Sequence, residues 1–345
     1  MTADDLDLIL QAYHSLFDLR PLLFFDEIQN IEGWEHFARR LANQKYNIYI
    51  TGSNAKMLSR EIATTLGGRF WNKDVYPYSF AEYLNARDII LSKNWMYGKQ
   101  AAEVSKAFND YFLYGGFPEL TDVIAKRVWL NDIYSKIFFS DLIVRNKFRN
   151  EEALGLLVRR LAENVKQPIS YTRLANLISS IGIKISKATV IEFIRYLKES
   201  CLIFPIENYA AKFAERNSNM KHYFIDNGLL SIFLLDGNTS LLENIVAIHL
   251  YKRYDAQLYF YNQNIEVDFV IPEAKTAIQV SYSLMDETTC RREVEGLIKL
   301  NRVFPMDNMC IITQDEERII THESGVSIHV IPVWKWLLEE EPLRT

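Results

Sequence analysis

The first fifty residues alternate between apolar runs and an amphipathic helical pattern, and this order restricts the fold more than any other feature. Pro21–Asp26 is a short apolar run that ends in an acid, as expected of a strand buried on both faces. Helical spacing of apolar residues follows from Trp34 to Leu41, and Asn47–Thr51 predicts a second strand. Strand, helix and strand in this order predict a right-handed crossover and a parallel sheet.

Polar side chains follow both predicted strands. Asp26 and Glu27 end the first strand, and the turn Thr51–Asn54 closes the second. Because ligands of such sheets bind beyond the carboxyl ends of the strands, we expect these groups to be neighbours. Adjacent acids at a strand end are typical of the Walker B pattern of P-loop NTPases, where the aspartate holds Mg²⁺ and the glutamate polarises the attacking water. The polar turn suits a sensor beside the γ-phosphate.

Composition and charge narrow the class of protein. A chain of 345 residues predicts two or three domains of roughly 150 residues each. Residues 126–200 hold 14 Lys and Arg against 7 Asp and Glu, a net charge of +7 inside a chain of net −5, which suggests an anionic partner. The sequence has no apolar run of membrane-spanning length and no secretory signal, and its three cysteines lack metal-ligand spacing. We therefore expect a cytoplasmic protein with no membrane contact.

Residues 169–210 contain a helix-turn-helix pattern. Ser170 precedes a predicted helix over 171–180, Gly182 marks a turn, and Ser186 precedes a second helix over 187–200. The apolar run 201–206 follows as a strand, which favours a winged helix-turn-helix. Apolar residues of the second helix should face the core and basic residues should face duplex DNA. The expected core residues are Val190, Phe193, Ile194 and Leu197, and the expected DNA-binding residues are Lys184, Lys187, Arg195 and Lys198.

From residue 242 onward the pattern predicts an independent α/β unit. The predicted elements are a helix over 242–254, strands over 257–261, 266–271 and 277–282, a helix over 286–300, strands over 309–313 and ending near 331, and a last helix from about 332.

Several motifs, in order along the chain, resemble a prokaryotic family of AAA-like P-loop ATPases. Its members join an ATPase domain to a carboxyl-terminal domain of unknown function with a restriction-endonuclease-like (PD-(D/E)xK) core. The matching segments are Phe24–Glu35, Ile48–Asn54, Leu58–Ile62, Gly67–Arg69, Tyr114–Pro118, Tyr223–Gly228, Leu242–Asn244 and Glu266–Val270. They cover essentially the whole chain.

The resemblance implies ATP and Mg²⁺ as cofactors of intact members. Asp26 and Glu27 would then be the catalytic acids, with Asp26 as a metal ligand. The nucleotide-binding residues would be Thr51, Ser53, Asn54 and Arg69. Arg69 is favoured over Arg60 as a phosphate-contacting finger because its flanking glycines allow close backbone approach.

One departure from the family decides the expected mechanism. The P-loop, Gly-x-x-x-x-Gly-Lys-Ser/Thr, should lie upstream of residue 1, and it occurs nowhere in these 345 residues. The amides and the lysine that cradle the phosphates are therefore missing. The chain resembles an amino-terminally shortened member, and we expect that, as given, it neither binds ATP tightly nor hydrolyses it.

The carboxyl-terminal region holds a second candidate site. Glu243 on a helix and Asp268 on a strand would converge on a divalent ion, as in the PD-(D/E)xK nucleases. On the third motif, Gln279 stands where that family has a glutamate, and Ser281 where it has a lysine. The nuclease core is therefore expected to be degenerate. A relocated lysine remains an alternative, with Lys275 the nearest candidate.

Together these patterns predict a three-part α/β protein. A partial parallel-sheet P-loop ATPase domain spans 1–100, a helical region 101–168, a winged helix-turn-helix 169–210, and a restriction-endonuclease-like α/β domain 211–345. The predicted function is an ATP-switched, nucleic-acid-associated protein with duplex DNA as partner. The alternatives are a non-catalytic protein-interaction module of a defence or toxin–antitoxin type, with a protein partner or self-association, and a metal-dependent DNA nuclease.

Overall fold

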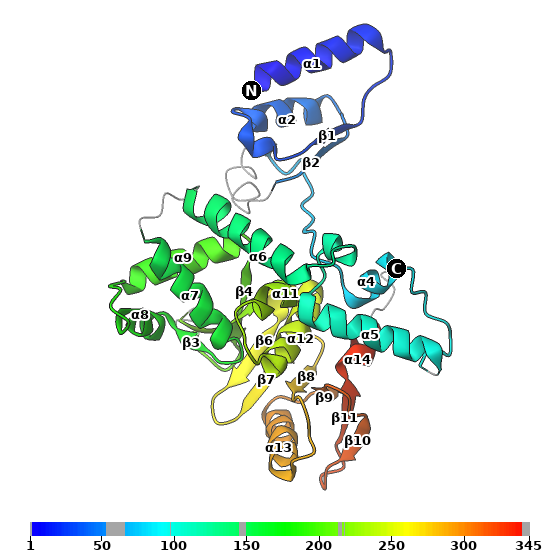
Figure 1. Ribbon diagram of the computed structural model, residues 1–345, viewed down its shortest axis with the longest axis vertical. Helices are drawn as coiled ribbons and strands as arrows, with labels where there is room; N and C mark the ends of the chain where they lie inside the picture. Colours follow the sequence, from blue (N-terminus) through cyan, green and yellow to red (C-terminus); the bar gives the residue numbers. More distant parts are fainter. Residues whose placement is uncertain are drawn as a thin grey trace. The chain divides into compact units, whose positions relative to one another are not determined.

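The computed structural model describes residues 2–52, 66–96, 98–144, 150–212, 216 and 218–339 (Figure 1). The chain divides into two units, which are described separately below. The small unit is Met1–Val75 with Glu199–Cys201, and the large unit is Tyr76–Lys198 with Leu202–Thr345. None of the described helices is both long enough and apolar enough to cross a membrane.

The small unit contains the predicted crossover. Its elements are α1 (Ala3–Leu16), β1 (Leu23–Phe25), the 3-10 turn η1 (Ile28–Asn30), α2 (Trp34–Asn43) and β2 (Ile48–Ile50). The strands β1 and β2 pair in parallel, with Leu23 opposite Ile48 and Phe25 opposite Ile50, so the predicted parallel pairing is confirmed. Helix α2 buries Trp34, Phe37, Ala38 and Leu41, the four residues whose spacing predicted it.

The two faces of this small sheet differ sharply. On one face Phe25 packs edge-on against Phe37 of α2, with ring centroids 5.6 Å apart. On the other face Phe24 and Tyr49 stack on each other at 4.9 Å and are 70% and 56% exposed. Among the described residues, β1 and β2 pair only with each other. The small sheet therefore has one covered face and one aromatic face open to solvent.

The large unit is built on one mixed sheet of nine strands in the order β10-β11-β9-β8-β7-β6-β4-β5-β3. The strands are β3 (Ile169–Ser170), β4 (Ile203–Asn208), β5 (Asn219–Phe224), β6 (Tyr259–Asn262), β7 (Glu266–Ile271), β8 (Thr276–Val280), β9 (Asn308–Thr313), β10 (Arg318–Thr321) and β11 (Ser327–Pro332). Three pairings are parallel, β4 with β6, β8 with β9, and β9 with β11, and the others are antiparallel.

The helices of the large unit pack against this sheet and each other. They are α4 (Phe80–Ala86), α5 (Lys99–Tyr114), η3 (Pro118–Thr121), α6 (Lys126–Lys136), the π-helix η4 (Ile137–Val144), α7 (Glu151–Glu163), α8 (Tyr171–Ser179), α9 (Lys187–Glu199), α11 (Asn227–Ser231), α12 (Asn238–Tyr254), η5 (Asp255–Gln257), α13 (Glu287–Val303) and α14 (Val333–Glu339). Figure 1 shows α7, α8 and α9 beside one end of the sheet, and α13 beside the strands nearer its other end.

The helix-turn-helix elements lie close to their predicted bounds. The Ser170 hydroxyl accepts the amide of Arg173 at the start of α8, and the Ser186 hydroxyl accepts the amide of Thr189 at the start of α9. These caps satisfy amides that have no partner within the helix. As predicted, the buried residues of α9 are Val190, Phe193, Ile194 and Leu197.

The expected domain boundaries within the large unit are not boundaries in the structure. The expected border at residue 210 separates β4 from β5 and β6, yet β4 pairs with both. One continuous apolar core joins the helical region, the helix-turn-helix and the carboxyl-terminal strands. The small unit ends near residue 75 rather than 100. Spacing along the sequence predicts helices and strands but not which strands are neighbours. The pairing of β4 with β5 and β6 joins the regions on either side of residue 210.

Candidate functional site

The carboxyl edge of the small sheet carries the predicted Walker B acids. The Thr51 hydroxyl donates to the Asp26 carboxylate, and the Glu27 amide donates to Thr51 Oγ1 at 3.3 Å. Glu27 adopts a left-handed φ of 49°, which turns the chain directly after β1. Asp26 and Thr51 are exposed. The structure therefore brings the ends of both strands together, as the crossover required.

Two of the other predicted nucleotide-binding residues, Ser53 and Asn54, lie outside the described residues. Arg69 is described and exposed, and its guanidinium donates to the carbonyl of Leu66 at 3.3 Å, within its own turn. The flanking Gly67 and Gly68 have φ of 59° and 73°, a backbone conformation that disfavours side chains. The role of Arg69 as a finger remains a prediction.

The large unit holds a cleft of about 610 Å³. Its lining combines carboxylates with basic side chains, a mixture that suits a polar or charged ligand. The charged residues that line it are Glu243, Glu266, Asp268, Glu293, Glu295, Lys166, Arg292 and Lys299.

The structure places all three residues of the predicted nuclease-like set in this cleft. Glu243 projects from α12, Asp268 from β7 and Gln279 from β8, and each is less than 10% exposed. The Gln279 side chain bridges the backbone of β7: its Oε1 accepts the amide of Asp268 at 2.9 Å, and its Nε2 donates to the carbonyl of Glu266 at 3.0 Å. Gln279 is therefore engaged as a brace between strands.

A lysine that the sequence analysis missed lies at the centre of this cluster. Lys221 of β5 is 0% exposed, and its ammonium lies 3.1 Å from Glu243 Oε1, 3.0 Å from Asp268 Oδ1 and 3.5 Å from Glu266 Oε1. A signal was present: Lys221 interrupts the otherwise largely apolar run from Met220 to Phe224. A buried lysine in a strand requires carboxylates as partners. Glu243, Glu266 and Asp268 follow later in the sequence.

The predicted alternatives for the lysine are not at this centre. Lys275 pairs instead with Asp307 at 3.4 Å, and both side chains are more than half exposed. Ser281, at the position of the family's lysine, donates to the carbonyl of Ser283 at 3.0 Å. The lysine at the centre of the cluster is instead Lys221, which comes from β5 earlier in the chain.

The electrostatics of the cluster follow from burial and contact. Burial alone would lower the pKa of Lys221, but the attraction of Glu243, Asp268 and Glu266 holds it well above its usual range. Burial is also the main cause that raises the pKa of Glu243 to about 7, although Lys221 opposes the shift. The Tyr223 hydroxyl donates to Glu243 Oε1 at 2.7 Å. The carboxylates are thus held by fixed donors on several strands.

The donor set does not fit a magnesium ion as it stands. Both oxygens of Asp268 are engaged, Oδ1 with Lys221 and Oδ2 with the amide of Val280 at 3.0 Å. Glu243 Oε1 already accepts from Lys221 and Tyr223. Mg²⁺ needs several oxygens near 2.1 Å, which this ammonium-centred arrangement lacks. Across the part of the chain that the structure describes, no group of three His, Cys, Asp or Glu is placed to hold a metal. The donor set of the cleft therefore supports no catalytic step through a metal at Glu243 or Asp268, and the role of Asp26 as a metal ligand remains a prediction.

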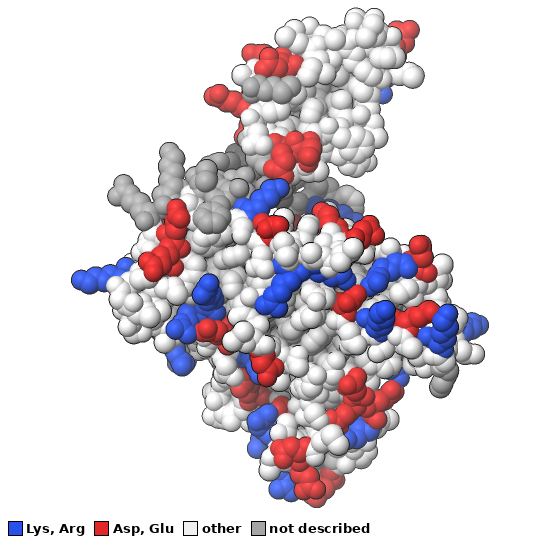
Figure 2. Space-filling model, viewed as in Figure 1, with Lys and Arg blue, Asp and Glu red and all other residues white. Residues whose placement is uncertain are grey.

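The exposed side of α9 gathers the predicted basic residues. Lys187, Arg195 and Lys198 are exposed, and Lys184 is exposed in the turn before the helix. Positions 187, 195 and 198 are separated by 8 and 3 residues, so they lie along one side of a helix of 3.6 residues per turn. Figure 2 shows Lys and Arg side chains protruding from the part of the molecule that carries α7, α8 and α9.

The glycine and aspartate motifs that the sequence analysis singled out form a buried polar network. Asp226 accepts the amides of Gly116 at 2.7 Å and Gly228 at 2.8 Å. A Cβ on Gly115 would lie 2.0 Å from the Asp226 carboxylate, so this contact requires glycine. The motifs at 114–118 and 223–228 therefore join α5 to α11 and are structural.

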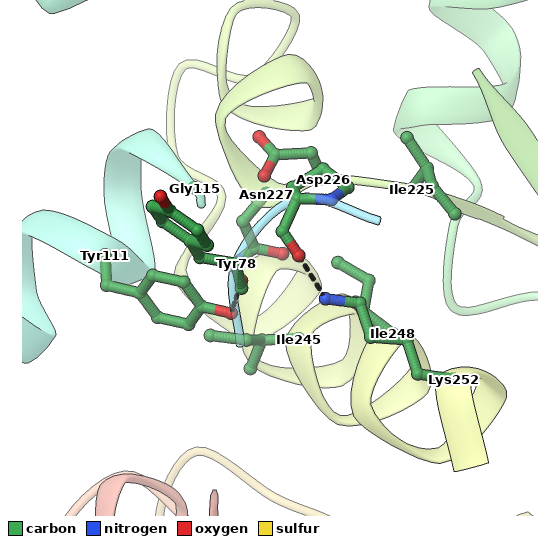
Figure 3. A pocket seen from close by; sticks show the side chains of 10 residues that line it. Tyr78, Tyr111, Gly115, Ile225, Asp226, Asn227, Ile245, Ile248 and Lys252 are labelled. Atoms are coloured by element: carbon green, nitrogen blue, oxygen red, sulfur yellow. Dashed lines mark hydrogen bonds between the residues drawn. The ribbon is translucent and has the colours of Figure 1, made fainter. Parts of the chain in front are cut away.

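A small pocket of about 10 Å³ lies beside this network, with room for about one water molecule (Figure 3). Lys252 of α12 donates to the carbonyl of Pro77 at 2.6 Å, and the Tyr111 hydroxyl donates to the carbonyl of Tyr78 at 2.9 Å. Burial lowers the pKa of Lys252 to about 8 and raises that of Asp226 to about 6. The pocket is too small for a substrate, and its polar groups anchor the chain at residues 77 and 78.

Comparison with protein-family models gives two matches. Residues 1–84 match the AAA domain, and residues 105–254 match a domain of unknown function (DUF8612). The second match runs through the helical region, the helix-turn-helix and α12. It gives no support to the restriction-endonuclease-like core that the resemblance implied.

Curated relatives and a solved structure were also similar. "Uncharacterized protein MJ1544" of Methanocaldococcus jannaschii is 33% identical over 97% of this chain and 78% of that protein. An uncharacterized protein of Haemophilus influenzae is 29% identical over 98% of this chain and 82% of its own length. The Walker-type ATPase PABY2304 of Pyrococcus abyssi superposes with a TM-score of 0.37 at 14% identity, over 61% of this chain and 62% of that one.

Proposed function

This chain belongs to the family that includes the Methanocaldococcus jannaschii protein MJ1544, and we propose that it is an ATPase-family protein whose large unit binds duplex DNA. The AAA-domain match of residues 1–84 supports a general ATPase-like function. In the intact system, nucleotide on the small unit would control the large unit, because the Asp26–Thr51 edge is where such sheets hold ligands.

The observation that carries the DNA proposal is the basic face of α9. The element order α7, β3, α8, α9, β4, β5, with β5 paired to both β3 and β4, is the order of a winged helix. In this motif the second helix of the pair enters the major groove. Here that helix is α9, and it buries its apolar side while exposing Lys187, Arg195 and Lys198.

The chemistry of α9 favours binding that depends little on base sequence. Lysine and arginine neutralise phosphates, whereas base edges are read by side chains with directed hydrogen bonds. On α9 the candidates for base contact are Thr189 and Arg195. The guanidinium of Arg195 lies 4.6 Å from the ring centroid of Tyr196, which holds it against the helix. Phosphate contacts therefore dominate the proposed interface.

The test is the salt dependence of DNA binding by this chain. Fluorescence anisotropy with a labelled duplex of about 20 base pairs should give a log–log slope of affinity against salt near −3, from three or four phosphate contacts at about −0.9 each. Replacing Lys187 and Lys198 by Ala should weaken binding to every sequence alike and flatten the slope by about two.

The matched control is Lys99→Ala with Lys106→Ala on α5, which removes the same charge from a different helix. That variant should keep the slope of the unchanged chain. If binding is independent of salt, absent at low salt, or equally weakened by both double variants, the DNA proposal fails. The helix-turn-helix would then be a protein-docking module.

A further inference from the structure

Three carboxylates of the cleft surround one ammonium group. Lys221 lies 3.1 Å from Glu243 of α12, and 3.0 and 3.5 Å from Asp268 and Glu266 at the start of β7. An ammonium has three N–H donors and no acceptor. It donates to Glu243 and Asp268 and forms an ion pair with Glu266, so the group occupies the place that a bound cation would take between these carboxylates.

The scaffold around Lys221 holds this arrangement rigidly. The Lys221 side chain has no exposed surface, and its ammonium lies 5.7 Å from the ring centroid of Phe260 on β6. Asp268 is fixed by the Val280 amide and, through its own amide, by Gln279. Because the carboxylates and the lysine are held by separate elements, the ammonium cannot leave without unpairing buried charges.

A divalent ion in the same place would face two obstacles. It would stand within a few ångströms of a fixed positive charge in a site of low dielectric. It would also find few free ligands, because Asp268 uses both oxygens and Gln279 uses both ends of its amide within the protein. Glu293 of the same cleft is paired with Arg292 at 2.6 Å.

We propose that the Lys221 ammonium is the permanent cation of this carboxylate site, and that it replaces the divalent metal that such a cluster would otherwise bind. The cleft of the large unit then takes its ligand without a metal ion. This inference is independent of DNA binding by α9, because no residue of α9 lines the cleft.

The test is direct titration with Mn²⁺, followed by the loss of its free-ion EPR signal at pH 7. All proteins carry Asp26→Asn, so that the predicted metal ligand of the small unit does not contribute. The protein with Lys221 should bind no Mn²⁺ at the cleft below about 1 mM. Lys221→Met, which removes the charge and keeps the length of the side chain, should gain one site at least tenfold tighter, and adding Glu243→Gln should abolish that site.

A second variant decides the question even if Lys221→Met does not fold. Gln279→Glu adds a fourth carboxylate to the cluster while Lys221 stays in place, and it should still bind no Mn²⁺ more tightly than about 1 mM. The proposal is overturned if the protein with Lys221 binds one Mn²⁺ that Asp268→Asn removes, if Gln279→Glu binds one, or if a folded Lys221→Met protein binds none.

Discussion

The two units stabilise the acidic side chains of their candidate sites in opposite ways. In the small unit Asp26 stands exposed at the edge of a two-stranded sheet and accepts from the neighbouring Thr51. In the large unit Glu243 and Asp268 are buried and share the ammonium of Lys221. Water and an incoming ion can compensate exposed acids, whereas buried acids must carry their own cation.

The difference teaches that a carboxylate motif does not show by itself whether a bound ion or a side chain of the protein supplies the positive charge beside it. At the small sheet the polar edge is open and suits a ligand that brings Mg²⁺ with it. In the cleft the protein supplies the positive charge. Burial decides between the two, and burial depends on how many strands and helices surround the site.

The largest expected effect is the difference in stability lost when an aromatic residue of each sheet is replaced by alanine. Phe269 of β7 is 0% exposed and packs on Tyr223, whereas Phe24 of β1 is 70% exposed and stacks on Tyr49. Phe269→Ala should lower the unfolding free energy of the large unit by about 3–5 kcal/mol, because it leaves a cavity. Phe24→Ala should cost the small unit about 1 kcal/mol or less, the loss of one exposed aromatic pair.

Hydrogen–deuterium exchange with mass spectrometry measures both units in one sample, because peptides from residues 2–52 and from 219–271 report separately. Each substitution should raise exchange mainly in its own unit. Equal losses for Phe24→Ala and Phe269→Ala would show that the aromatic face of the small sheet is as well covered as the core, and would contradict the comparison.

A smaller effect concerns acid stability of the large unit. Burial, aided by the charge of Lys198, lowers the pKa of His222 on β5 to about 4. The unfolded chain takes up this proton near pH 6.5, so the contribution of His222 is complete above that pH and is lost as pH falls towards 4. Between pH 7 and pH 4, the unfolding free energy of His222→Phe should therefore fall by about 3 kcal/mol less than that of the unchanged chain.

Urea unfolding at several pH values measures this difference. Asp226 and Glu243, whose pKa values are raised to about 6 and about 7 by burial, contribute with the opposite sign, but they are present in both proteins and cancel in the comparison. His329→Gln on the exposed side of β11 is the control and should follow the unchanged chain. An acid slope that His222→Phe leaves unaltered would contradict the prediction.

The smallest expected effect is at the small sheet. Asp26 and Thr51 are in place, but no Gly-x-x-x-x-Gly-Lys-Ser/Thr occurs in these 345 residues to cradle the phosphates. Isothermal titration of this chain with Mg-ATP should therefore give almost no heat, and Asp26→Asn should change nothing measurable. Micromolar binding that Asp26→Asn weakens would reverse this expectation.

Much of the local structure could be predicted from the sequence. Apolar spacing gave α2 and the buried side of α9, and serines marked the starts of α8 and α9. The strand β10 was missed, because Arg318–Thr321 is an exposed edge strand without a buried stripe. Pairing of β4 with β5 and β6 crosses the expected boundary at 210, and one apolar core crosses the expected boundary at 168, which spacing along the sequence could not show.

The sequence by itself determined which side chains could form the cleft site, since its resemblance to the PD-(D/E)xK nucleases singled out Glu243, Asp268 and Gln279. Only the tertiary structure decided what they do. It carries Lys221 across from β5 and turns Gln279 to the backbone of β7. The physical reason is that spacing fixes positions along one element, whereas a counter-charge acts through space and can come from any strand that the fold brings within about 3 Å.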